Sequence, residues 1–255
     1  MNHRPQFSHD ANFLRRATQS PRAACAVIAL AILAFGVAAP GATRRRPASK
    51  ATEPAGAPVK AYGSSSAPIT MEVFSDYQCP SCRNLYENTL RPMIGDYVAS
   101  GKVYLVHRDF PLPMHKYGYE AARWVNAAAR VGEFQSVEAA LYDNQNSWDA
   151  DGNIGKYVSA AMSAAEFRRV QKLMEGCEAP TSASIHPPEV IRVAQASHGC
   201  LFDAFIDADR ALGNKIPVQA TPTYIITYKG QHLPAGSGFV SWPILKQFFD
   251  SLLGQ

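Results

Sequence analysis

The spacing of hydrophobic residues changes twice along this chain, and the changes separate strand-like from helix-like sequence. β-Branched and aromatic residues crowd two short runs, Ile69–Ser75 and Lys102–Phe110, as is typical of buried strands. Between these runs, Pro80 suits the first turn of a helix that continues to about Ala99. We therefore predict a strand, a helix and a second strand in this order.

Helical spacing begins near residue 114 and persists for roughly 100 residues. Ser163, followed three residues later by Glu166, is a capping-box signature within this block. Apolar residues fall on one face of each of two earlier helices: Tyr117, Ala121, Trp124, Val125 and Ala128, then Phe134, Val137, Ala140 and Leu141. Because structureless connections of such length are rare in compact domains, we expect a helical insertion over about 114–200, with further helical sequence ending near Leu212.

Strand spacing returns at Thr223–Tyr228, and Lys229-Gly230 is expected to turn the chain into Gln231–Pro234. Ser241 then stands at the cap position of a terminal amphipathic helix. The predicted fold class is α/β, with the helical insertion covering one side of the sheet.

The first 66 residues differ in composition from the rest of the chain. Arg15, Arg16 and Arg22 lie shortly before an uncharged apolar run, Ala23–Ala39, as in an export signal or a membrane anchor. Its length lies between those of a signal core and a spanning helix, so both remain open, with an anchor favoured. Both place the following domain outside the cytoplasm. The basic excess behind the net charge of +4 also lies in this extension, so no nucleic-acid partner is predicted.

These changes divide the chain into four segments. We expect a basic segment at 1–22, a signal peptide or transmembrane anchor at 23–42, and a flexible linker at 43–66. The linker is rich in Pro, Ala, Gly and Ser, and its end is expected to form a short edge strand near Val59–Tyr62. The globular domain is predicted over 67–255. Because this length leaves no room for a separate dimerisation domain, we expect a monomer.

The motif that carries chemistry is Cys79-Pro80-Ser81-Cys82, directly after a strand and at the start of a helix. A helix N-terminus presents unpaired N–H groups and partial positive charge, both of which stabilise a thiolate. Cys79 is therefore the expected nucleophile, and Cys82, one turn further, can resolve a mixed disulfide. A zinc site would need two more ligands, and no second close cysteine pair follows, so we predict no metal. A purely structural disulfide between the two cysteines is a further alternative.

Thr221-Pro222 precedes the strand at Thr223–Tyr228. One interpretation is an ordinary trans proline at a strand start. The other is a cis bond that exposes the backbone of Thr221 beside the cysteines, where it would pair with an extended substrate chain.

Three motifs together resemble the DsbA-like branch of the thioredoxin superfamily. They are VFSDYQCPSCR at Val73–Arg83, RDFPL at Arg108–Leu112 and ATPT at Ala220–Thr223. The resemblance covers about Ala67–Leu253 and implies a thioredoxin fold with an inserted helical domain. It also implies a nucleophilic Cys79, a resolving Cys82 and a cis Pro222 that faces them, with Pro80, Ser81 and Thr221 in support. The sequence departs from the best-known oxidases, which have Pro-His between the cysteines.

Cys177 and Cys200 flank a proline-rich stretch in the helical region. In an oxidising compartment we expect them to form a structural disulfide.

The predicted function is an extracytoplasmic thiol:disulfide oxidoreductase that acts on protein substrates and needs no cofactor. Family likeness implies a membrane redox partner, and residues 23–42 imply contact with the inner membrane. Two alternatives remain open. One is an exported reductase or isomerase, and the other is a non-catalytic thioredoxin-fold chaperone or binding module.

Overall fold

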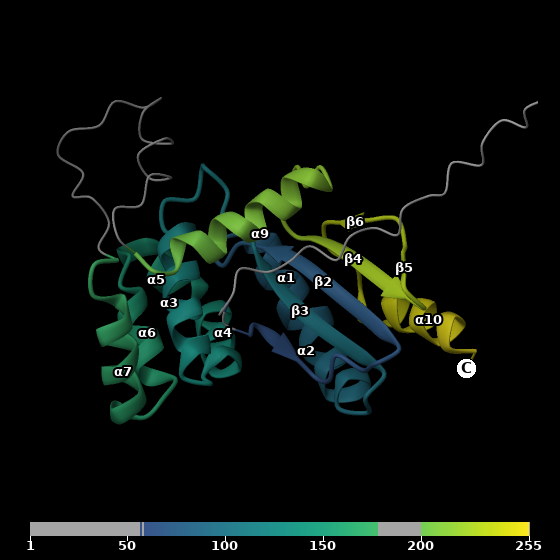
Figure 1. Cartoon of the computed structure of the whole chain (residues 1–255), viewed down its shortest axis with the longest axis horizontal. Coiled ribbons are helices and arrows are strands. Elements are labelled where there is room, and N and C mark those ends of the chain that lie inside the picture. Colours follow the sequence, from purple (N-terminus) through teal and green to yellow (C-terminus); the bar gives the residue numbers. More distant parts are fainter. Residues whose placement is uncertain (1–56, 58, 178–199, 255) are drawn as a thin grey trace, which may run out of the picture. The chain divides into compact units, whose positions relative to one another are not determined.

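A central sheet organises the residues that the computed structural model describes, which are 57, 59–177 and 200–254 (Figure 1). The strand order is β1-β3-β2-β4-β5, and β6 pairs with β4. β2 and β3 are parallel, whereas β1 and β4 run antiparallel to their neighbours. The strands are β1 Ala61–Tyr62, β2 Ile69–Ser75, β3 Val103–Asp109, β4 Thr223–Tyr228, β5 Gln231–His232 and β6 Gly236–Ser237. The sequence predicted all but β6.

A helical run with two π-helical turns connects the parallel strands β2 and β3. It comprises α1 Pro80–Leu85, η1 Tyr86–Leu90, α2 Arg91–Met93 and η2 Ile94–Val98. Its bounds agree with the single helix predicted up to about Ala99. The π-turns flank Pro92, which lacks the N–H that a regular helix would use there.

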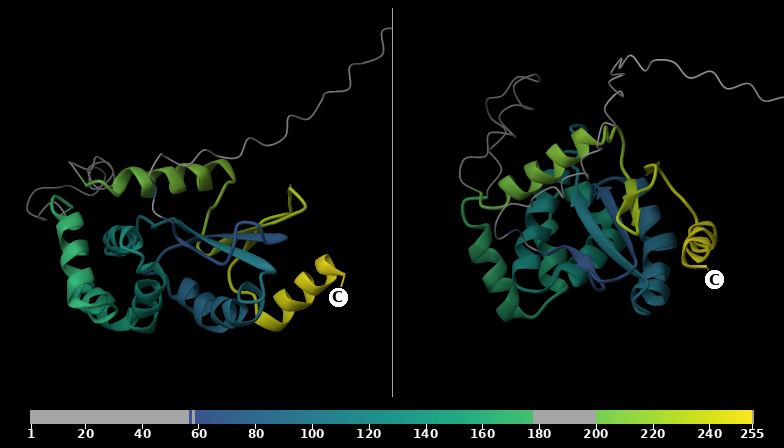
Figure 2. Two further views of the ribbon diagram at one scale, coloured as in Figure 1. Left: turned by 60° about the horizontal axis from the view of Figure 1, so that its bottom comes forward. Right: turned by 45° about the vertical axis from the view of Figure 1, so that its right-hand side comes forward.

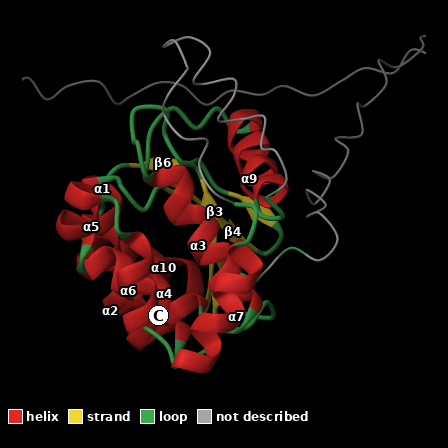
Figure 3. Cartoon of the chain, turned by 90° about the vertical axis from the view of Figure 1, so that its left-hand side faces the viewer, coloured by secondary structure: helices red, strands yellow, loops and turns green. Residues whose placement is uncertain are grey.

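The predicted helical block lies between β3 and β4 in the chain, and Figure 3 views the molecule from the end where most of its helices lie, in front of the strands. It contains α3 Gly118–Arg130, α4 Phe134–Asp143, α5 Gln145–Asp151, α6 Ile154–Ala160, α7 Ala164–Met174 and α9 Asp203–Lys215. The capping box at the start of α7 is confirmed, since Ser163 and Glu166 each bond to the other's backbone N–H. The sequence analysis did not separate α5 and α6, which are short.

Helices cover both faces of the sheet (Figure 2). α9 packs on one face, where Phe74, Phe110, Val218 and Ile225 form a small buried cluster. The α1–η2 run and the terminal helix α10 Trp242–Leu253 lie on the other face, over the larger core. Ser241 is the N-cap residue of α10, as predicted, but its side chain makes no capping hydrogen bond.

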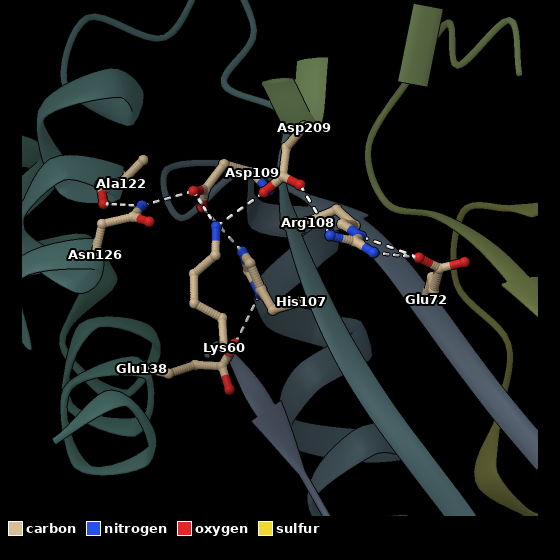
Figure 4. Close-up of polar contacts among 9 residues, drawn as sticks. All are labelled: Lys60, Glu72, His107, Arg108, Asp109, Ala122, Asn126, Glu138 and Asp209. Atoms are coloured by element: carbon tan, nitrogen blue, oxygen red, sulfur yellow. Dashed lines mark hydrogen bonds and ion pairs between the residues drawn. The ribbon is translucent and has the colours of Figure 1, made fainter. Parts of the chain in front are cut away.

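The end of the predicted linker belongs to the folded unit, which corrects the 43–66 boundary. Lys60 is only 7% exposed, and its ammonium group pairs with Asp109 at the end of β3 and with Asp209 of α9, the latter at 2.9 Å (Figure 4). Burial opposes the charge of Lys60, yet the two carboxylates raise its pKa overall. The sequence around Lys60 does not indicate that two distant carboxylates pair with its side chain.

The same polar cluster joins the sheet to the helical block. Asn126 of α3 donates to Asp109 at 2.7 Å. His107 lies between Glu138 of α4, at 2.8 Å, and Asp109, at 3.4 Å. Burial disfavours the charged imidazole, but hydrogen bonds with Asp109 and Glu138 outweigh it and raise the pKa of His107. The cluster therefore links β1, β3, α3, α4 and α9 through charges removed from water.

Outside the residues that the structure describes lie the basic segment 1–22 and the signal or anchor predicted at 23–42. Within the described ranges, no helix has the length and hydrophobicity needed to cross a membrane.

Replacing Lys60 by Met is expected to destabilise the protein by about 3–5 kcal/mol, because two buried carboxylates lose their cation. Urea unfolding measures this change. Arg91→Ala is the control, since the Arg91–Asp143 pair is exposed and its loss should cost less than about 1 kcal/mol. Equal effects of the two substitutions would contradict the role of the buried cluster.

Candidate functional site: two cysteines at the start of a helix

Strand pairing brings three loops to one edge of the sheet. β2 and β3 are parallel with Ser75 opposite Asp109, so the loops that follow them leave at the same end. β4 is antiparallel to β2 with Thr223 opposite Phe74, so the segment before β4 arrives at that end as well. This register alone places Cys79 near Thr221 and Pro222.

Cys79 is the N-cap residue of α1, with an extended backbone (φ −75°, ψ 120°) and Pro80 as the first helical residue. Its carbonyl oxygen accepts hydrogen bonds from the N–H groups of Cys82, at 3.1 Å, and Arg83, at 3.2 Å. Cys79 is 7% exposed and Cys82 is 1% exposed, and both are free thiols. The sulfur of Cys79 is therefore the more accessible of the two.

The two thiols have very different acidities. A hydrogen bond from Cys82 lowers the pKa of the Cys79 thiol to about 5, assisted by the Thr221 hydroxyl and by the N–H groups of Cys82 and Ser81, while burial opposes the shift. These N–H groups belong to the first turn of α1, as the helix N-terminus argument predicts. Burial and the neighbouring Cys79 raise the pKa of Cys82 well above that of a free thiol. At neutral pH the pair therefore holds one anion, on Cys79.

The Thr221–Pro222 bond is cis, the second of the two interpretations left open above. In its protonated form, the Cys79 thiol donates to the Thr221 carbonyl oxygen at 3.4 Å. The Thr221 hydroxyl is buried and has no hydrogen-bond partner within the described ranges, so it is available to the Cys79 thiolate. Gly238 donates to the Pro222 carbonyl oxygen at 2.8 Å, which ties this segment to the chain after β6.

Asp76 and His115 stabilise the loops around Cys79, and the sequence analysis did not identify His115. The buried Asp76 carboxylate accepts from the N–H groups of Gln78 and Leu112, both at 2.8 Å, and from Nδ1 of His115 at 2.6 Å. The hydrogen bond with Asp76 raises the pKa of His115 despite partial burial, and Cys79 adds to the effect. A histidine in a loop far along the chain carries no pattern that would reveal this contact.

A second residue missed from the sequence is Gln145, the first residue of α5. It is 2% exposed, and its side-chain amide donates to the carbonyl oxygens of Tyr77 and Cys79. No cluster of three or more His, Cys, Asp or Glu side chains suited to a metal ion occurs in the described part of the chain.

Cys177 and Cys200 form a disulfide within the helical block, as the sequence predicted. Both are buried. Arg123 of α3 supports the region by donating to the Cys177 carbonyl oxygen at 3.1 Å and to both carboxylate oxygens of Asp203, at 2.7 and 3.0 Å.

The alkylation rate of Cys79 in the reduced protein is expected to reach half its maximum near pH 5, following its pKa of about 5. The folded-state pKa of Cys79 lies below the pKa of an unfolded thiol, so the thiolate stabilises the reduced fold. This stabilisation is complete above the pKa of the unfolded thiol and is lost as the pH falls through about 5. Thr221→Val removes a donor and should move the midpoint up by on the order of one pH unit. Thr221→Ser keeps the hydroxyl and should not. Equal midpoints for the Val and Ser variants would contradict this role.

Comparison with known proteins gives a consistent classification. The thioredoxin family model matches residues 57–233. The crystal structure of alpha-DsbA1 from Wolbachia pipientis is similar, with 19% identity, a TM-score of 0.53, and coverage of 77% of this chain and 91% of that chain. BdbD from Bacillus subtilis in its oxidised form has 18% identity, a TM-score of 0.54, and coverage of 77% and 94%. These identities establish likeness of fold, and no curated protein matches the sequence. Since the family model spans more than half of the chain, the protein belongs to the thioredoxin family, with the DsbA-like fold that its motifs predicted.

Proposed function

We propose that this protein is an extracytoplasmic thiol:disulfide oxidoreductase that exchanges disulfides with protein substrates through Cys79 and Cys82. The observation that carries the proposal is the unequal thiol pair. Cys79 has a pKa of about 5 at the start of α1, and Cys82 is a buried thiol with a raised pKa. A structural pair has no need of such an acidic thiol.

In the proposed reaction, a substrate thiolate attacks the sulfur of Cys79 in the Cys79–Cys82 disulfide. The bond between the two cysteines breaks, Cys82 leaves with the electron pair and takes a proton, and a mixed disulfide joins Cys79 to the substrate. A second substrate thiolate then attacks the substrate sulfur of this bond and displaces Cys79 as a thiolate. Two electrons have moved from the substrate to the protein, and the substrate holds a new disulfide.

The proposed direction is oxidation of the substrate. Stabilising the Cys79 thiolate favours the reduced protein, and a protein whose reduced form is favoured is the stronger oxidant. The acidic Cys79 is also the better leaving group from a mixed disulfide. A membrane redox partner that reoxidises the pair is part of this proposal, as is a thiol-containing, extended protein substrate beside Thr221. We propose that the protein works as a monomer.

Cys79→Ser is expected to reduce the oxidation of a reduced, unfolded test protein such as ribonuclease to the uncatalysed rate, because the attacked sulfur is lost. When Cys82→Ser is given a test protein that contains disulfides, its Cys79 thiolate is expected to break a substrate disulfide and to accumulate as a mixed disulfide that reducing agent releases, since the resolving thiol is missing. Gel electrophoresis under non-reducing conditions measures both. Binding of unfolded protein that is unchanged in Cys79→Ser, with no catalysed oxidation by the natural chain, would instead support a binding module. Rapid insulin reduction without substrate oxidation would support the reductase.

We propose that residues 1–42 direct the domain out of the cytoplasm, either as an anchor at 23–42 or as a cleaved signal. The expectation is that protease added to intact spheroplasts of a Gram-negative host digests the anchored domain, or that the domain is released with the periplasmic fraction. A variant that lacks residues 1–42 should stay with a cytoplasmic marker. Full protection of the natural chain inside intact spheroplasts would contradict export.

A further inference from the structure

We propose that Gln145 is a positioning residue for disulfide exchange, through which the helical insertion holds the loop that carries Cys79. This inference rests on the proposed function. Gln145 lies 66 residues after Cys79 in the chain, at the start of α5, and it belongs to none of the sequence motifs.

The contact is a bridge between two backbone carbonyl groups. Nε2 of Gln145 donates to the Tyr77 oxygen at 2.6 Å and to the Cys79 oxygen at 3.0 Å. A side-chain amide has two N–H donors, and here both are used on one short loop. Tyr77 lies in a turn outside the strands and helices, and the Gln145 amide gives its carbonyl oxygen a donor in a buried environment.

The position of the Cys79 carbonyl matters for the chemistry. That oxygen also accepts from the N–H groups of Cys82 and Arg83, and thereby begins α1. A rotation of the Cys79 peptide group would change the direction of the first-turn N–H groups that stabilise the thiolate. It would also move the sulfur from its contact with Thr221, at 3.4 Å. Gln145 gives this carbonyl oxygen a further donor, which comes from α5 rather than from α1.

Two exposed contacts align α5 with the same region. Asp149 accepts a hydrogen bond from the side chain of Gln78, and Asn146 accepts one from Arg83 at 2.7 Å. Because they are exposed, water can replace them at little cost. Without the Gln145 amide, the Tyr77 carbonyl would lose its donor in a buried environment, and the Cys79 carbonyl would keep only the two helix N–H groups.

α5 has a separate anchor, so its place in the fold does not depend on Gln145. Trp148 is fully buried, and its indole N–H donates to the Leu141 carbonyl oxygen of α4 at 2.7 Å. Replacing Gln145 by Met, a side chain of similar length without donors, should therefore leave α5 docked and release only the loop.

The test compares Gln145→Met with Gln135→Met in the full-length protein. Gln135 is an exposed glutamine of α4 in the same insertion and provides a matched control. In Gln145→Met we expect the pH midpoint of Cys79 alkylation to rise by on the order of one unit. The equilibrium constant with glutathione should shift by about tenfold toward the disulfide form, because the thiolate is less stabilised. Gln135→Met should change neither value.

A purely structural role predicts a different result. If Gln145→Met lowers the unfolding midpoint but leaves the alkylation midpoint and the glutathione equilibrium unchanged, the inference is wrong. If this variant does not fold, Gln145→Asn keeps the amide on a shorter side chain and should shift both values in the same direction by a smaller amount. Failure of the proposed function is distinguishable, because the natural chain would then not accelerate oxidation of the reduced test protein and Cys82→Ser would accumulate no mixed disulfide.

Discussion

A buried ammonium group needs carboxylate partners, and this requirement organises the described fold. Lys60 finds them in Asp109, at the end of β3, and in Asp209 of α9. Asp109 and Asp209 come from segments 100 residues apart, so satisfying one cation joins the edge strand β1, the centre of the sheet and a helix after the insertion. Removing such charges from water is favourable only when the partners are held in place, and the surrounding core holds them.

The same end of β3 connects this cluster to the redox loop. Arg108 pairs with Glu72 of β2 and with Asp209, so the strand that leads to Cys79 is held to the strand that carries the ion-pair cluster. The ring of Tyr77, two residues before Cys79, stacks on His107 with 4.7 Å between centroids. The loop that carries Cys79 therefore contacts the charged cluster through Tyr77 and contacts α5 through Gln145. Its shape is set by the whole domain rather than by the four-residue motif alone.

Short sequence patterns were sufficient to predict those parts of the fold and the site that depend on adjacent residues. The strand runs, the capping box of Ser163 and the cysteine motif at the start of α1 each follow from a few adjacent residues. Lys60, His115 and Gln145 act through partners that are 39 to 149 residues away, and no spacing rule reveals such contacts. Lys60 was placed at the end of the predicted linker, where a short edge strand was expected, and nothing in the sequence indicated that its side chain is buried.

The disulfide between Cys177 and Cys200 joins two parts of the chain that each contribute to the reactive centre. The part before Cys177 carries the two redox thiols, and the part after Cys200 carries Thr221 and Pro222. A nick anywhere in residues 178–199 would therefore produce two fragments that stay covalently attached, each with half of the reactive centre. Peptide continuity between the halves is dispensable for keeping them together as long as this crosslink is oxidised.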